Sequence, residues 1–265
     1  MIAFKNYPDK IFFIIFRLSF SYNWLNQQLN IMKRRLLAGT ALILLSLGSI
    51  AFGQEQDKTT LKYSAGIITG YNRGFGIQTN LTAYNFGPTF PVKLRFGIGL
   101  SLIDPGNAAD ARRIFINNAT NGVPEKNGRS FDFRLDFMFP KTIFGNKNSY
   151  LTFGPRFSTF RGHFDYVDGN EVFDLTSTQW GAGAGIENQF KLTPKLSLVL
   201  NYGLDIYLPS TLTGHDTSYS PNNDNVNPEE NNQNNDNPFT YKDADKAIRQ
   251  PFIMPHIMIG VNFNL

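Results

Sequence analysis

The segment Phe131-Asp132-Phe133-Arg134-Leu135-Asp136-Phe137-Met138-Phe139 alternates apolar with mostly charged residues. Its odd positions are Phe, Phe, Leu, Phe and Phe, and the positions between them are Asp, Arg, Asp and Met. Successive side chains of a β-strand point to opposite faces, so a strand gathers the apolar residues on one face and the charges on the other. A helix would scatter the same charges among the phenylalanines. The segment therefore predicts a β-strand with one apolar and one ionic face.

Seven further segments show the same period of two, which gives eight predicted strands. They span residues 61–71, 75–83, 92–102, 131–139, 150–160, 173–190, 196–206 and 252–265. Most reach the roughly 9–11 residues that a tilted strand needs to cross a membrane. The longer connections are the third, fifth and seventh, so an up-and-down arrangement brings them to one end, as 104–129, 161–172 and 208–250. We therefore expect an all-β fold, an eight-stranded antiparallel up-and-down transmembrane β-barrel.

The direction of the two faces separates a membrane barrel from a soluble, lipocalin-like barrel with its apolar residues inside. The polar face is rich in glycine, which suits a crowded lumen better than a surface in water. Its charges also balance, four basic against four acidic, and buried charges are tolerated when they are paired. We expect a polar network in the lumen, made of Lys93, Arg95, Arg134 and Arg156 with Asp132, Asp136, Glu187 and Asp205. The alternative is a set of solvated surface charges.

The N-terminal part of the chain predicts secretion. A basic Met32-Lys33-Arg34-Arg35 start, an apolar run to Ile50 and a small-x-small site ending at Gly53 describe a cleaved signal peptide over residues 32–53. Residues 1–31 match no structural template and are interpreted as an upstream extension, so the barrel domain covers 54–265. The alternative is an uncleaved membrane helix, but the run is short and interrupted by glycine and serine.

The basic character of the whole chain comes from this same region. The isoelectric point is near 9.2, but residues 1–53 hold six basic residues against Asp9, and the remainder is close to neutral. The charge therefore gives no reason to expect nucleic-acid binding.

The pattern resembles the small bacterial outer-membrane barrels of the OmpX and OmpA-membrane-domain type, and most closely the PorT-like proteins of Gram-negative lineages. The resemblance rests on the signal peptide, the glycine-rich segment before Phe190-Lys191-Leu192-Thr193-Pro194, and the closing strand. Ile257, Ile259, Val261 and Phe263 match the alternating end that the barrel-assembly machinery reads, although the last residue is Leu265 and not aromatic. The resemblance implies location in the cell outer membrane of the cell envelope, with lipid around the barrel.

Residues with catalytic or metal-binding chemistry are few. His163 with Asp165 could form a hydrolytic pair, but the spacing places no serine beside them. His215 lies in the last loop, and His256 falls on the lumen face of the last strand. The Asn-rich tract 221–238 predicts disorder, with weak calcium binding as the alternative. We expect no catalytic residue, no metal site and no cofactor.

These expectations lead to three hypotheses for function. An eight-stranded barrel is wide enough only to pack its own side chains, so we expect a structural or interaction protein that acts through its outer loops, with a loop ligand or protein partner that the sequence leaves unidentified. The first alternative is a narrow transport or secretion-accessory channel, with ten strands if residues 113–119 pair with the sheet. The second alternative is an outer-membrane hydrolase.

Overall fold

The computed structural model describes residues 60–265 except 117–121, 170, 215–216, 223 and 227–238. These residues belong to one compact unit, Thr59–Leu265. The predicted signal peptide, the upstream extension and most of the Asn-rich tract lie outside the described residues.

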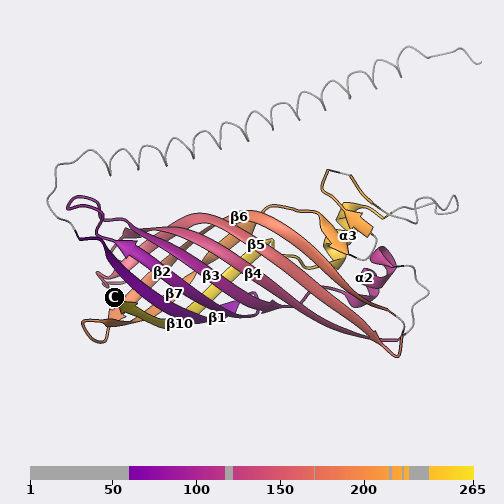
Figure 1. Ribbon diagram of the computed structural model, residues 1–265, viewed down its shortest axis with the longest axis horizontal. Coiled ribbons are helices and arrows are strands. Elements are labelled where there is room, and N and C mark those ends of the chain that lie inside the picture. Colours follow the sequence, from indigo (N-terminus) through magenta and orange to yellow (C-terminus); the bar gives the residue numbers. More distant parts are fainter. Residues whose placement is uncertain (1–59, 117–121, 170, 215–216, 223, 227–238) are drawn as a thin grey trace, which may run out of the picture. The chain divides into compact units, whose positions relative to one another are not determined.

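Eight long antiparallel strands form the body of this unit (Figure 1). They are β1 (Lys62–Asn72), β2 (Phe75–Tyr84), β3 (Lys93–Ile103), β4 (Val123–Pro140), β5 (Ser149–Val167), β6 (Val172–Lys191), β7 (Leu196–Tyr207) and β10 (Ile253–Asn264). Each pairs with its neighbours in the chain, and the first strand also pairs with the last, β1 with β10. The pairing of β5 with β6 leaves no open edge in this ring, so the sheet closes into a barrel. The predicted eight-stranded antiparallel barrel is confirmed.

The two faces of the strands point in the predicted directions. On β4, the inward residues Asp132 and Arg134 are 0% and 3% exposed, whereas the outward residue Phe131 is 40% exposed. Neighbouring strands repeat this arrangement, and their outward aromatic rings contact one another: Phe133 lies 6.1 Å from Phe157, and Phe157 lies 4.9 Å from Trp180, measured between ring centroids. The charges therefore face the lumen, and the apolar side chains form the outward face.

Strands β4 and β5 extend well beyond the segments that the sequence predicted, whereas β6 agrees with the predicted segment 173–190 to within one residue at each end. The extra residues of β4 and β5 occupy parts of the ranges 104–129 and 161–172, which we expected to be loops. On β5 the same alternate positions still point inward, but beyond the barrel body they carry apolar residues and the outward positions carry polar ones. On β5, Phe160, Phe164 and Tyr166 are buried inside, while Arg161 points outward. The pattern that identifies a membrane strand stops at this level, so the predicted segments for β4 and β5 are too short.

Short elements in the two longest connections cover the loop end of the barrel (Figure 1). They are helix α2 (Ala108–Phe115), helix α3 (Tyr241–Ala247), and the three-residue strands β8 (Leu212–Gly214) and β9 (Thr217–Tyr219). We call these four elements the cap. Neither described helix is long and apolar enough to span a bilayer.

The positions of β8 and β9 decide between eight and ten strands in the barrel. The sheet does contain ten strands, but the two additional ones are β8 and β9, which form a hairpin beside the extension of β6. Arg113, where we expected a possible extra strand to start, lies in helix α2, and residues 117–119 of that segment lie outside the described residues. Eight strands form the barrel.

Candidate functional site

The lumen contains ion pairs that connect opposite walls of the barrel. Arg95 on β3 and Glu187 on β6 form a bidentate pair in which the Arg95 Nη2 atom lies 2.7 Å from Glu187 Oε1. The two residues are 3% and 0% exposed. Gln189 also donates a hydrogen bond to Glu187. These two strands stand three positions apart around the ring, so the pair crosses the lumen.

A second group of charges centres on Asp205 of β7. Its carboxylate lies 2.6 Å from the Arg134 guanidinium of β4 and 2.7 Å from the Arg156 guanidinium of β5. Arg156 also contacts Asp136 at 2.6 Å. All four side chains are buried. A buried charge whose partner is removed costs several kcal/mol, about 3–5 by mutation in other proteins, so these four groups depend on one another.

The two remaining charges of the expected network are not ion-paired in the described part of the chain. Lys93 places its ammonium over two aromatic rings, 4.3 Å from the centre of Tyr150 and 4.9 Å from that of Tyr84. Asp132 accepts hydrogen bonds from Ser130 at 2.8 Å and from the Tyr207 hydroxyl at 3.4 Å. The expected four-against-four pairing is therefore replaced by three arginines paired with three carboxylates.

Sequence reasoning missed the uncharged members of the lumen. Gln78, Asn80, Asn201 and Gln189 are buried there, together with the mutually hydrogen-bonded Ser130 and Ser158. All except Ser130, which precedes the predicted segment 131–139, occupy inward positions of strands that the alternation had identified. The same period of two could have found them, because position along a strand, and not charge, decides which side chain enters the lumen.

Glycine at position 183 makes room for the second group of charges. A Cβ atom built there would overlap Asp205 Oδ1 and lie 2.6 Å from Arg156 Nε. Any larger residue would have to displace the carboxylate that holds two arginines. The glycine content of the inner face therefore has a steric reason at this position.

A hydrophobic core fills the loop end, between the cap and the inner faces of the extended strands. It consists of Ile103, Ala108, Ala111, Ile114, Phe115, Phe160, Phe164, Tyr166, Phe173, Leu175, Leu212, Tyr219, Ala244, Ala247 and Ile248. Two buried hydroxyls fix helix α2 to this core: Tyr166 donates to the Ala108 carbonyl at 2.6 Å, and Tyr219 donates to the Ile114 carbonyl at 3.0 Å. The cap is thus packed onto the barrel like an ordinary protein interior.

Asp104, just after the end of β3, joins three segments of the loop end. Its carboxylate lies 2.7 Å from Lys126 Nζ and 2.8 Å from Arg249 Nη1, and it accepts a hydrogen bond from the Gly106 amide. Partial burial on its own raises the pKa of Asp104, but the hydrogen bonds from Lys126 and Gly106 and the charges of Lys126 and Arg249 outweigh it and lower the pKa. The charged form is therefore the one that ties the cap to the barrel.

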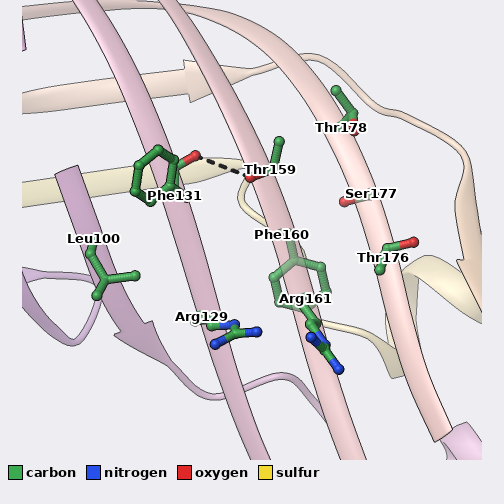
Figure 2. Close-up of a pocket in the computed structure, with 9 residues that line it drawn as sticks. All are labelled: Leu100, Arg129, Phe131, Thr159, Phe160, Arg161, Thr176, Ser177 and Thr178. Atoms are coloured by element: carbon green, nitrogen blue, oxygen red, sulfur yellow. Dashed lines mark hydrogen bonds between the residues drawn. The ribbon is translucent and has the colours of Figure 1, made fainter. Parts of the chain in front are cut away.

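The outward face of β4, β5 and β6 carries a shallow hollow where these strands change from apolar to polar (Figure 2). Its volume is about 380 Å³. We call it the outer-wall hollow; it is lined by Leu100, Arg129, Phe131, Thr159, Phe160, Arg161, Thr176, Ser177 and Thr178. None of these residues was a site candidate from the sequence, because they lie where the strand pattern changes.

His163 lies just above this hollow, but not in the pairing that we expected. Its Nδ1 atom is 3.0 Å from Asp174, which also pairs with Arg161, whereas Asp165 is not its partner. His256 lies in the lumen, with Nδ1 3.6 Å from Asp205, and His215 lies outside the described residues. Among the described residues, no group of three His, Asp or Glu side chains could hold a metal ion.

Replacing Gly183 with Ala should destabilise the folded barrel. The added methyl group must displace Asp205 or Arg156, and such overpacking costs roughly 1–3 kcal/mol. The midpoint of urea unfolding, followed by the gel mobility of the folded form, measures the change. Gly87→Ala is the matched control, because its Cβ would meet nothing closer than 4.0 Å. Equal midpoints for the two variants would contradict the steric role of Gly183.

Replacing Asp104 with Asn should loosen the cap and leave the barrel folded. Each exposed ion pair contributes roughly 0–1 kcal/mol, so amide hydrogen exchange in residues 105–116 and 239–250 should be several-fold faster. Acidification should act similarly on the wild type, since a carboxylate with a lowered pKa stabilises the fold at neutral pH and loses this effect as the pH falls through that pKa. Asp110→Asn, which breaks an exposed pair within α2, is the control; an equal change there would contradict the role of Asp104.

Comparison with known proteins supports the fold alone. No protein-family model matches the chain, and no curated protein sequence matches it significantly. Among solved structures, a major outer membrane protein from Thermus thermophilus is 20% identical, with the match covering 78% of this chain and 100% of that one, and has a TM-score of 0.60. Neisserial surface protein A and Acinetobacter baumannii CarO2 are 12% and 13% identical, each covering 77% of this chain and 96% and 98% of their own, with TM-scores of 0.34 and 0.37. The chain has the fold of an outer-membrane β-barrel.

Proposed function

We propose that this chain is an outer-membrane protein whose barrel is closed to diffusion and which acts as a structural or interaction protein through its loop end. The observation that carries the proposal is the pair of barriers in series along the barrel axis. The first is the set of buried ion pairs around Glu187 and Asp205, and the second is the hydrophobic core beneath the cap. Side chains at both levels are almost completely excluded from water.

The outward face supports location in a membrane. Large apolar side chains are exposed on every strand of the barrel, among them Tyr71, Phe75, Phe96, Phe153, Trp180 and Ile257. Soluble monomers rarely expose continuous apolar patches beyond a few hundred Å². In lipid, the same apolar surface is favourably surrounded by acyl chains, and closure of the ring leaves no open strand edge exposed to them. We place the start of β1 and the end of β10 on the periplasmic side and the cap outside the cell.

The cap supports a role in interaction. Helices α2 and α3 each present an exposed polar side, with Asp110 and Arg113 on α2 and Lys242 and Asp243 on α3. The first turn of each helix is stabilised by a side chain at its N-terminus. The Asn107 side chain accepts a hydrogen bond from the Ala109 amide at 2.9 Å, and Thr240 and Asp243 form a reciprocal capping box. A surface held this firmly on a rigid barrel can bind a partner without first being ordered.

The chain should be oriented with its cap outside the cell. It contains no cysteine, so a single introduced cysteine can be labelled selectively. Lys242→Cys, on α3, should react with a membrane-impermeant maleimide on intact cells. Lys195→Cys, in the exposed turn between β6 and β7, should react only after the outer membrane is opened. The opposite result, or equal labelling of both, would contradict the proposed orientation.

The purified barrel should also be electrically silent. Reconstituted in a planar bilayer, the wild-type chain should show no stable open steps under conditions in which a general porin conducts, since ion pairs and an apolar core block the axis. A sample that migrates faster on a gel before heating than after it shows that the barrel is folded. Stable conductance steps from such a sample would favour the narrow-channel alternative and contradict the closed barrel.

A further inference from the structure

Two arginines face each other directly across strands β4 and β5. The register pairs Arg129 with Arg161, and both side chains point outward (Figure 2). Residues directly opposite in an antiparallel pair have Cβ atoms about 4.5–5.5 Å apart, and like charges in this position destabilise a sheet. Such a pair is readily explained where an anion bridges the two guanidinium groups.

The partners of the two arginines are unequal. Arg161 pairs with Asp174 on β6. Arg129 is exposed, and its guanidinium makes no hydrogen bond or ion pair with any residue in the described ranges. The positive charge of the pair is therefore only half neutralised, and the five N–H donors of Arg129 remain available to a ligand.

The surroundings of the pair suit an oxyanion attached to an apolar tail. Arg129 and Arg161 line the outer-wall hollow together with the outward residues Thr159, Thr176 and Thr178. The hydroxyls of Thr159 and Thr176 already donate to the carbonyls of Phe131 and Thr213, so the arginines are the main donors to an anion here. Leu100 and Phe131 form the apolar side of the same hollow (Figure 2). A smaller hollow of about 130 Å³ adjoins the arginines on the other side, lined also by Asn127 and His163.

The level of the pair along the barrel fits a lipid headgroup. On β4, the outward positions from Phe131 to Phe139 are all apolar. Arg129 on the same strand and Lys141, just after its end, flank them. Twelve residue steps separate 129 from 141, which is about 41 Å along a strand and about 31 Å along the membrane normal at a tilt near 40°. A bilayer has a hydrocarbon core of about 30 Å. Arg129 therefore lies at the outer boundary of the apolar band.

Acidic residues confine the positive region to this level. Farther from the membrane on the same strands, Glu125 and Asp165 are paired in register, two residues beyond the Asn127 and His163 pair. An anion that approached from solvent would meet these carboxylates first. An anion held at the membrane surface would meet the arginines directly.

We propose that Arg129 and Arg161 bind the phosphate group of a lipid headgroup in the outer leaflet, with the lipid chains lying along Phe131 and Leu100. The inference rests on the membrane location proposed above. Guanidinium groups bind phosphate through two parallel hydrogen bonds, which a single ammonium group cannot make. Binding also removes the repulsion between the two arginines, so the lipid both fills the hollow and stabilises the strand pair.

Native mass spectrometry of the folded barrel tests the proposal. The protein is released from micelles that contain equal amounts of phosphatidic acid, which carries a phosphate monoester, and phosphatidylcholine, which is zwitterionic. The wild type should retain phosphatidic acid preferentially. Arg129→Gln should retain about tenfold less, the order expected when one charge-assisted contact is lost. Lys141→Gln, the same charge change at the opposite boundary of the apolar band, should behave as the wild type does.

A second variant and a second ligand keep the test decisive. Thr159→Glu adds a carboxylate to the hollow at an exposed position and should abolish preferential retention, including if Arg129→Gln fails to fold. Unchanged retention in a folded Arg129→Gln or Thr159→Glu variant would overturn the proposal, as would an equal loss in Lys141→Gln. Inorganic phosphate at millimolar concentration should not displace the lipid; if it does, the site binds free phosphate and the lipid assignment is wrong.

The result also separates this inference from the proposed function. A chain that fails the gel-mobility and labelling tests is not a membrane barrel, and both proposals fall. A folded, correctly oriented barrel that shows no preference for phosphatidic acid loses only the lipid site.

Discussion

The architecture depends on a carboxylate held between two arginines in the middle of a closed ring. Asp205 on β7 contacts Arg134 and Arg156, and through Arg156 it is linked to Asp136, so strands β4, β5 and β7 are joined across the lumen. No charge in this group could be buried alone, because each would carry an uncompensated desolvation cost. The same requirement explains why three arginines and three carboxylates of the inner face are paired, and why residue 183, which lies against Asp205 and Arg156, is glycine.

The long strands β4, β5 and β6 serve two environments in succession. Over the barrel body their apolar side chains point out and their polar side chains point in. Beyond it the outward positions become mostly polar on all three strands, and the inward positions become apolar on β5 and β6. The change occurs without a break in pairing, since β5 and β6 remain in register from Ser149 to Asp165. One continuous sheet therefore presents apolar residues to lipid at one level and to the core beneath the cap at the next. The opposed arginines lie at the level where the faces change.

Much of the fold could be predicted from the sequence, because a period of two is visible without any knowledge of contacts. The eight strands, their facing and the end of the barrel that carries the long connections all follow from it. Partner choice could not be predicted, since alternation shows that Asp132 faces the lumen but not that it binds Ser130 and Tyr207. The outer ends of β4 and β5 were missed because the outward positions become polar there, as at Arg129 and Arg161, and the outer-wall hollow was missed with them.

The pairing of β1 with β10 sets the order of events in biogenesis. Tyr71 and Ile257 are partners in register although almost the whole barrel sequence lies between them. Bringing such distant segments together is entropically costly and slow. The ring stays open, with two unsatisfied edges, until β10 has been synthesised. Closure of the barrel must therefore follow synthesis of all eight strands, and the open sheet has to be kept from aggregating until then.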